Sequence, residues 1–354
     1  MMSNLKKYTL ILIAVLFSVN VFASENEEQH EKSFNLKELI FTHVLDAYDW
    51  HLFTINGKHF AIPLPVIVKS KERGWFVFSS ERLQHGENYE GFYIAQGEKN
   101  HNKVVEINSA GEEVRPFDVS LTKNAVSILL TSVLLITLFL LMARSYKKEP
   151  FRSRKGFIGS LEMLIVAIYD DLIKPCVGHE YKRFAPYLLT AFFFIFSANL
   201  MGLVPFFPGG ANVTGNIAIT MVLALTTFAV TNIFGSKEYW KEIFWPDVPT
   251  WLKVPVPIMP FIEFLGILTK PFALMIRLFA NMLAGHIIIL VLVSLIFIFS
   301  TFISPIVGGG VSIISVLFSI FILLLDVLVS FIQAYVFTML SAIFIGMGRV
   351  QHAH

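Results

Sequence analysis

The feature that most constrains the fold of this 354-residue chain is a series of long, nearly uncharged apolar runs. A helix needs roughly 20 apolar residues to cross the hydrocarbon core of a bilayer, and several runs reach that length. Only 15% of the residues are charged, whereas a soluble globular domain carries roughly 25%. We therefore predict an all-α polytopic membrane protein with a small β-containing region at its amino terminus.

The first residues have the pattern of a secretory signal peptide rather than that of a first membrane span. Lys6 and Lys7 precede a short apolar core over 8–19, and Val21-Phe22-Ala23 fits a small-x-small cleavage pattern. We expect a signal peptide over 1–23, so that the residues after it are delivered across the membrane. An uncleaved signal anchor is the alternative.

Residues 24–120 differ in composition from the rest of the chain. They are polar and contain short β-like runs, such as Phe60–Pro63 and Gly74–Phe78, separated by Gly, Asn and Lys. A small exported domain is predicted here. Its histidines lack metal-ligand spacing, and the single cysteine, Cys176, excludes an internal disulfide. We expect no metal and no cofactor.

About five transmembrane helices are predicted within a domain over 121–349, followed by a cytoplasmic tail over 350–354. The first helix, about 124–143, is followed by six Lys and Arg residues over 144–155, which mark its cytoplasmic end. The apolar stretch over 157–175 carries four charged residues and is predicted to be an interfacial helix on that side. The other spans are expected at about 184–206, 216–234, 257–303 and 311–346.

The last two predicted helices are too long for upright spans. About 40 helical residues at about 1.5 Å each far exceed a hydrocarbon core of about 30 Å, so these helices must tilt, bend or follow the interface. Breaks are expected at Ser304-Pro305 and at Gly308–Gly310. The exported amino terminus and the basic loop give the same orientation, with the amino terminus outside and the carboxyl terminus in the cytoplasm.

Few ionisable groups interrupt the last two stretches. A charge at the bilayer centre costs between about 2.5 and 17 kcal/mol, so such groups face a protein interior or a water-filled path. An ion pathway is the default interpretation, and a structural ion pair or a snorkelling side chain is the alternative. Arg277 lies deep within apolar flanks, which favours the functional interpretation. The five groups are Glu263, Lys270, Arg277, His286 and Asp326.

Helical spacing orders these groups. Glu263, Lys270 and Arg277 recur every seven residues, so they form one stripe along a helix. Asn281 follows Arg277 by four residues and shares its face. His286 follows Arg277 by nine residues, which at about 100° per residue turns it to the opposite side. One helix thus carries a guanidinium on one side and an imidazole on the other.

The facing helix supplies Asp326 and Gln333, again seven residues apart. Arg277 stays protonated at physiological pH, so it cannot relay protons by titration, but it can attract a carboxylate and repel an excess proton. His286 and Asp326 can exchange protons. The pattern predicts a polar path through lipid and does not resemble an enzyme active site.

The run Ile276–His286, preceded by Lys270-Pro271, resembles subunit a of F-type ATP synthases. The family pattern is an arginine within R-L-F-x-N-x-x-A-G. Further matches are Glu263 upstream, Asn199–Pro205 in the second span and Gln333 in the last helix. The resemblance covers about 120–349, and the exported domain is longer than in compact members.

The resemblance implies a non-enzymatic stator subunit beside a rotating ring of small subunits, the c-ring, each with an essential carboxylate. Arg277 would separate two aqueous half-channels, with Lys270 also assigned to proton translocation. The exported-side half-channel would be bordered by Asn281, His286, Asp326 and Gln333. The cytoplasmic one would be bordered by Glu263 and Asn199. Stator b subunits, the rest of the complex and the lipid bilayer are the other expected partners, in a bacterial inner membrane, and no nucleic acid is expected.

Two departures from the family pattern matter. Many bacterial relatives carry Glu at the position of His286 and His at that of Asp326, and this exchange predicts direct contact between the two side chains. Gly202 replaces an acidic residue common in the second span. A His/Asp relay also suits H⁺ better than Na⁺ as the coupling ion.

Two other classes of protein were weighed. A free-standing ion channel or secondary transporter predicts internal repeats around a midplane site, and no repeat is visible. A membrane enzyme requires a nucleophile with its base or a metal-ligand set, and neither occurs in the spans. Nothing resembles a nucleotide-binding P-loop.

Overall fold

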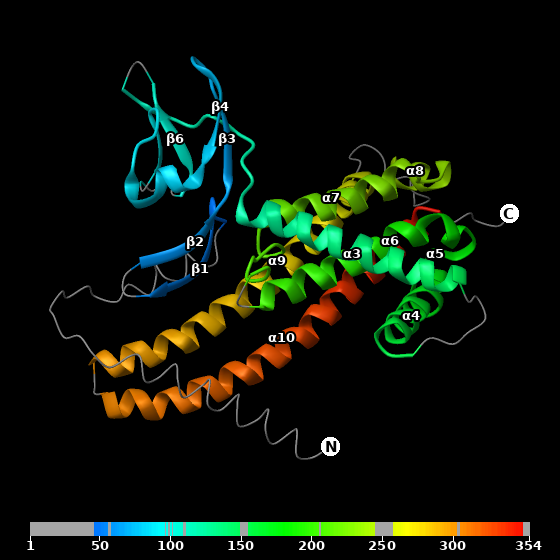
Figure 1. Ribbon diagram of the computed structural model, residues 1–354. Helices are drawn as coiled ribbons and strands as arrows, with labels where there is room; N and C mark the ends of the chain where they lie inside the picture. The colour runs from blue at the N-terminus through cyan, green and yellow to red at the C-terminus, as the bar shows by residue number, and fades with distance from the viewer. Residues whose placement is uncertain are drawn as a thin grey trace. The chain divides into compact units, whose positions relative to one another are not determined.

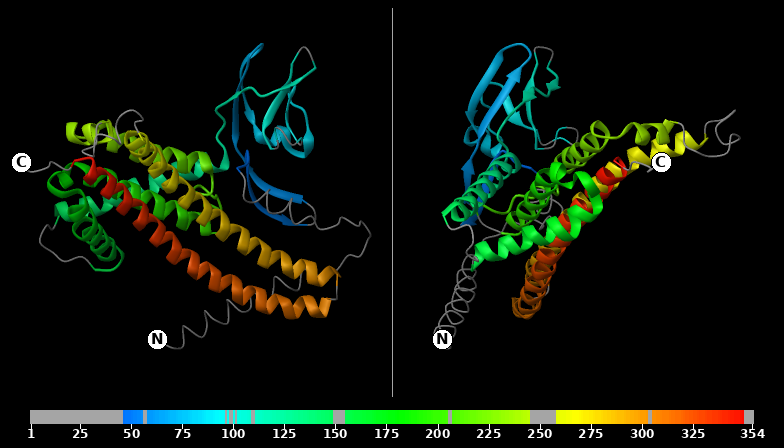
Figure 2. Two further views of the ribbon diagram at one scale, coloured as in Figure 1. Left: turned by 180° about the vertical axis from the view of Figure 1, so that it is seen from behind. Right: turned by 90° about the vertical axis from the view of Figure 1, so that its right-hand side faces the viewer.

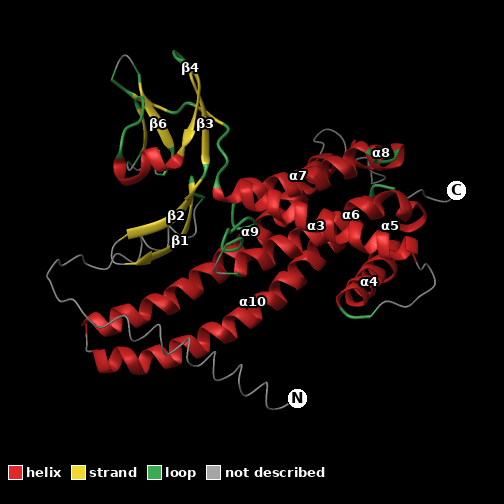
Figure 3. Cartoon of the chain, in the orientation of Figure 1, coloured by secondary structure: helices red, strands yellow, loops and turns green. Residues whose placement is uncertain are grey.

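The computed structural model describes residues 46–55, 58–95, 97, 100, 102–108, 111–148, 155–204, 207–244, 258–302 and 305–349. The predicted signal peptide over 1–23 and tail over 350–354 lie outside the described residues. Within these residues, strands occur only before residue 119, and helices follow from Lys123 onward (Figure 3).

The β region contains one hairpin and two three-stranded antiparallel sheets. Strand β3 is central in one sheet and β6 is central in the other (Figure 1). A short 3-10 helix, η1, spans Ser80–Gly86. The hairpin is β1 (Asp49–Ile55) with β2 (Lys58–Pro63), the first sheet is β4 (Gly74–Ser79), β3 (Pro65–Ser70) and β8 (Phe117–Asp118), and the second is β5 (Phe92–Ile94), β6 (Val104–Ile107) and β7 (Glu113–Val114).

A small apolar core holds this region together. Val66 and Val68 on β3 are fully buried and Lys69 is exposed, as expected for side chains that alternate across a strand. The rings of Phe78 and Phe92 lie 5.9 Å apart. Buried Tyr48 donates a hydrogen bond to the Asp118 carboxylate. Burial, together with this hydrogen bond, raises the pKa of Tyr48.

The rest of the chain is helical. Four described stretches are long and apolar enough to cross a membrane, or five if α7 and α8, which bend by 103° at their junction, form one span. This confirms the predicted helical membrane fold with a small β region. The elements are α3 (Lys123–Lys148), α4 (Phe157–Ala167), η2 (Ile168–Ile173, a π-helix), α5 (Lys174–Val177), η3 (Gly178–Glu180), α6 (Tyr181–Leu203), α7 (Ile217–Ile233), α8 (Lys237–Phe244), α9 (Ile258–Phe302) and α10 (Pro305–Met347).

The two long helices lie side by side in every view (Figures 1 and 2). Helix α9 has 45 residues and continues through Pro271, and α10 has 43. The predicted break at Gly308–Gly310 is wrong, because α10 begins at Pro305 and includes these glycines. Proline suits the first position of a helix, where its missing N–H has no intrahelical partner to lose.

The stretch predicted as an interfacial helix over 157–175 is a separate helical segment before α6. It consists of α4, the π-helix η2 and the short α5, and it ends at Gly178, where φ is 79°. In Figure 1, α4 diverges from the direction of α6. Its placement at a membrane surface stays a prediction.

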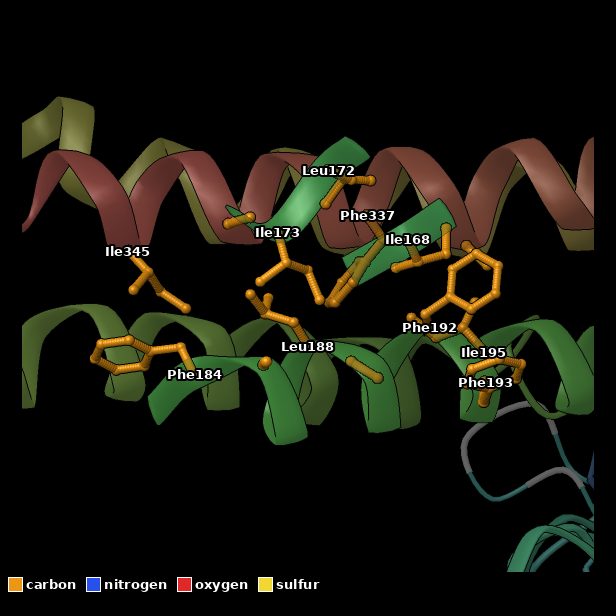
Figure 4. Packing of buried hydrophobic residues seen from close by; sticks show 14 of the residues in the cluster. Ile168, Leu172, Ile173, Phe184, Leu188, Phe192, Phe193, Ile195, Phe337 and Ile345 are labelled. Carbon is orange, nitrogen blue, oxygen red and sulfur yellow. The ribbon is translucent and has the colours of Figure 1, made fainter. Parts of the chain in front are cut away.

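The main membrane-region core lies where α6 meets α10 and η2. Leu188, Phe192 and Ile195 of α6 are fully buried, and so are Phe337 and Ile345 of α10. Figure 4 shows these side chains meeting with Ile168, Leu172 and Ile173 of η2. Because lipid tails are as apolar as these side chains, close van der Waals packing holds the helices together here.

Arg349, just after α10, joins the ends of three helices. Its Nη1 donates to the carbonyl oxygen of Phe234 at 3.1 Å, and its Nη2 pairs with the Glu180 carboxylate. The backbone N–H of Ser236 donates to Gly348 O at 2.8 Å. The end of α10 is thereby fixed to the end of α7 and the start of α6.

Replacing Arg349 by alanine is expected to lower the free energy of unfolding by about 1–2 kcal/mol, because it removes two hydrogen bonds that involve a charge. Lys174→Ala is the control. It removes an exposed ion pair to Asp170 at 3.9 Å, which contributes less than about 0.5 kcal/mol, and a distant contact of Nζ with the Tyr181 ring at 6.0 Å. Denaturant unfolding of the detergent-solubilised protein measures both, and equal losses would contradict this role of Arg349.

Candidate functional site

Helix α10 lies close against the backbone of α9 at Gly285. A methyl group added there would lie 2.9 and 3.0 Å from the two carboxylate oxygens of Asp326. Glycine therefore allows the carboxylate to lie directly on the α9 backbone. Oδ2 of Asp326 is buried and has no hydrogen-bond partner among the described residues.

A second link between the long helices lies on the Arg277 side of α9. Nδ2 of Asn281 donates to Oε1 of Gln333 at 2.8 Å. Asn281 is exposed and Gln333 is buried, so the pair runs from the surface of the chain into the helix interface. Nε2 of Gln333 is buried without a partner among the described residues.

His286 lies between α9 and α6. Its Nδ1 is 3.0 Å from Met282 O, and its Nε2 is 3.2 Å from Gly202 O. A neutral imidazole has one N–H and an imidazolium has two. Both carbonyl groups can therefore accept from a protonated ring, and the ring need not move to gain or lose one proton.

The predicted direct contact between His286 and Asp326 is wrong. The ring nitrogens face backbone carbonyl groups, and the carboxylate lies against Gly285. Among the described residues no ion pair or hydrogen bond joins the two side chains. The two groups still interact electrostatically, and α10 reaches the α9 backbone at Gly285, one residue before the histidine.

Gly202 and Asn199 bring α6 into the site. A Cβ at Gly202 would lie 3.2 Å from Ala211 O, which is tight, and in ordinary van der Waals contact with Cε1 of His286 at 3.6 Å. Asn199 is fully buried, and its Oδ1 accepts a hydrogen bond from Thr214. Nδ2 of Asn199 has no partner among the described residues.

The structure does not bring Asn199 and Glu263 together. Asn199 lies one helical turn before Gly202, whose carbonyl faces His286. Glu263 lies about 35 Å from His286 along α9 at about 1.5 Å per residue. Asn199 therefore belongs with His286, at the other end of the site from Glu263.

Arg277 faces out of the chain. The neighbouring Leu274 and Leu278 are buried against other helices, whereas Arg277, Ala273 and Ala280 are exposed. Within the described part of the chain Arg277 has no hydrogen bond or ion pair. The guanidinium thus lies on a surface of α9 made largely of small side chains.

At the start of α9, a cavity of about 20 Å³ has room for a water molecule. Nζ of Lys270 lies 5.4 Å from the centre of the Phe344 ring beside it. Glu263 is half-buried nearby and acts electrostatically on Tyr239. The polar residues that line the cavity are Thr227, Thr231, Asn232, Tyr239 and Lys270.

Except for Lys270, sequence reasoning missed these cavity residues. The signal was present, because Thr220, Thr227 and Thr231 recur at helical spacing within the largely apolar α7. It also missed Thr214, which has no sequence pattern that marks it. Within the described residues no group of three or more His, Cys, Asp or Glu is placed to hold a metal ion.

Comparison with known proteins identifies the family of the chain. Residues 125–346 match the family described as ATP synthase A chain, and residues 39–125 match a domain of unknown function (DUF8433). The chain is 40% identical over 286 residues to the ATP synthase subunit a of Chlorobium phaeobacteroides, with 77% of this chain and 80% of that protein covered.

Two further relatives are similarly close. The ATP synthase subunit a of Chloroherpeton thalassium is 42% identical over 249 residues, which cover 68% of this chain and 70% of that protein. The ATP synthase subunit a of Myxococcus xanthus is 43% identical over 244 residues, which cover 67% and 75%. The family match spans more than half of the chain and includes α6, α9 and α10 with all the candidate residues. The chain belongs to the ATP synthase A chain family.

Proposed function

We propose that Arg277 faces the carboxylate-bearing c-ring of the assembled ATP synthase, and that the polar groups on either side of it border two separate proton paths. As a member of its family, the chain is the non-catalytic, proton-translocating stator subunit of the membrane sector. It is a multi-pass membrane protein that works within the larger complex. A free-standing channel or a membrane enzyme is thereby excluded.

The observation that carries the proposal is the exposure of Arg277 on a membrane-spanning helix without a partner among the described residues. A bare guanidinium against lipid is costly, so its partner must come from another chain. A carboxylate suits the planar guanidinium best. The small side chains Ala273, Ala280 and Ala284 on the same face allow a neighbouring helix to approach closely.

One proposed path leads from the loop over 207–216 to Arg277. It is bordered by Asn199, His286 and Asp326 and ends at the Asn281–Gln333 pair. Oδ2 of Asp326, Nε2 of Gln333 and Nδ2 of Asn199 are buried without a partner among the described residues. Buried polar atoms are satisfied by water where protein groups do not reach them, which supports a hydrated path.

The other proposed path lies at the start of α9, where Glu263 and Lys270 flank the polar cavity. Along α9, Arg277 lies between this end and His286. Its permanent positive charge repels an excess proton, so a proton cannot pass directly from one path to the other. It must instead travel on a ring carboxylate.

The orientation follows from charge. We propose that the basic run after α3 and the start of α9 are cytoplasmic, and that the β region and the loop over 207–216 are exported. The exposed apolar face of α3, which includes Val133 and Ile136, is available for the stator b subunits.

Cysteine cross-linking tests which face of α9 meets the ring. In Ala280→Cys the new thiol lies on the Arg277 face, and oxidation in native membranes is expected to link it to a cysteine placed beside the ring carboxylate. Leu268→Cys is the control, because Leu268 is 56% exposed but about 180° around the helix from Arg277. Gel electrophoresis detects the product. A cross-link from Leu268→Cys alone would contradict the proposed face.

A further inference from the structure

We propose that Trp50, in the extramembrane β region, is a positioning residue for His286 and acts through the loop over 207–216. The inference rests on the proposed role of His286 in the exported-side path. It gives the β region, whose family is described only as a domain of unknown function, a part in proton translocation.

Trp50 is an apolar contact between the β region and the membrane helices. It is only 3% exposed and lies in one buried cluster with Ala198, Ala211 and Val213. Its ring meets the ring of Phe207 edge-on, with the centroids 5.2 Å apart. Three of these four neighbours belong to the α6–α7 loop, and Ala198 lies near the end of α6.

The loop that packs against Trp50 also contacts the polar groups of the candidate site. Ala211 O limits the space beside Gly202, whose own carbonyl lies 3.2 Å from Nε2 of His286. Thr214 donates to Asn199, the residue next to Ala198. Ala211 of the Trp50 cluster therefore lies against Gly202, whose carbonyl faces the imidazole, and Val213 of the cluster directly precedes Thr214, which donates to the buried amide.

Trp50 cannot simply follow the loop, because the chain just before it is fixed to α3. The N–H of Lys123 donates to Ala47 O at 2.9 Å, and the N–H of Asn124 donates to Oδ1 of Asp46 at 3.0 Å. On its other side, Trp50 pairs with Ile62 of β2. The indole thus provides a fixed surface against which the loop lies.

The charged groups that act on His286 come from two elements. Asp326 lies on α10, and Lys123 lies at the start of α3. Lys123 in turn interacts with Asp49, which directly precedes Trp50 in the chain, and with Asp46 three residues earlier. A shift of the loop or of the β1 start would therefore alter both the hydrogen-bond partner and the electrostatic surroundings of His286.

The test uses the complete ATP synthase in sealed membrane vesicles. Trp50→Ala is expected to slow passive proton flux through the membrane sector about tenfold, as for the loss of one well-placed hydrogen bond to the imidazole. It should also shift the midpoint of the flux against pH on the exported side. Hydrogen–deuterium exchange of the amides over 207–216 should increase.

Two variants serve as controls. Trp75→Ala removes a tryptophan of the same β region that is 58% exposed and does not belong to the Trp50 cluster, so flux, pH midpoint and exchange should stay as in the wild type. Trp50→Phe keeps an aromatic ring against Phe207 and should restore most of the flux. Should Trp50→Ala not assemble, Trp50→Leu replaces it, with the same direction of change expected.

An assembled Trp50→Ala or Trp50→Leu with wild-type flux and pH midpoint would overturn the inference, even if loop exchange increases. His286→Ala separates this from the proposed function. If that variant keeps the wild-type pH profile, the role of His286 in the path fails. If the dependence of flux on pH changes in His286→Ala but stays as in the wild type in the Trp50 variants, only the role of Trp50 fails.

Discussion

Replacing Arg277 by alanine is expected to abolish ATP synthesis coupled to proton flow, while the subunit remains in the complex. Removing one partner of a desolvated ion pair costs about 3–5 kcal/mol. If that cost falls on the step in which a ring carboxylate ionises, the rate drops by roughly two to four orders of magnitude. Assembly should survive, because Arg277 has no hydrogen bond or ion pair to the described part of its own chain. ATP synthesis by energised membrane vesicles measures the effect.

Ile276→Ala is the matched control for Arg277→Ala. Ile276 is the preceding residue and is also exposed, but it carries no charge, so its replacement should leave coupled synthesis close to the wild-type rate. Arg277→Lys keeps the charge but loses the planar fork that binds a carboxylate through two hydrogen bonds, and it should stay strongly impaired. Normal coupled synthesis in assembled Arg277→Ala would refute the proposed function.

Much of this fold follows from local sequence. Uninterrupted apolar runs predict the membrane helices, and the two longest runs predict α9 and α10 within a few residues. The rotation of about 100° per helical residue also correctly places Arg277 and His286 on different faces of α9. Arg277 is exposed, and His286 faces α6. These features depend only on residue type and helix geometry, and neither requires knowledge of tertiary contacts.

The contacts of His286 were not predictable in the same way. Its partners are the carbonyl groups of Met282 and Gly202, and every residue has a carbonyl group, so no sequence pattern marks them. The position of Asp326 depends on Gly285, the glycine of the motif, where the absence of a Cβ lets two helices meet. The exchanged residue types at positions 286 and 326 correctly predict that His286 and Asp326 lie near each other. They do not predict that the two side chains form no hydrogen bond or ion pair.

The position of Asn199 was recoverable from the sequence. The predicted orientation has the second span running from the cytoplasm outward, and Asn199 lies near its far end. Topology alone therefore predicts that it lies near His286, and the structure brings the two together through Thr214 and Gly202. The contact of Trp50 with the same loop depends on the packing of the β region, so the spacing of residues along the sequence does not predict it.

Replacing Asp326 by asparagine is expected to slow passive proton flux by roughly a hundredfold, the usual effect of removing a group that transfers protons. Asparagine keeps the shape that lies against Gly285, so the helices should pack unchanged. It cannot gain or lose a proton at neutral pH, so a relay that passes through this position is interrupted. Flux into vesicles stripped of the soluble catalytic sector, driven by a potassium diffusion potential, measures the loss.

Val327→Ala provides the comparison, because it changes an exposed apolar neighbour on α10 and should leave the flux unchanged.

A substitution at Gly285 should cause the same defect by a different means. A methyl group at Gly285 would press on both carboxylate oxygens, so Gly285→Ala should lower flux in the wild-type background. In Asp326→Asn it should add little, since two changes acting on one group are not additive. Additive losses, or full flux in Asp326→Asn, would show that protons reach Arg277 by a route that does not include Asp326.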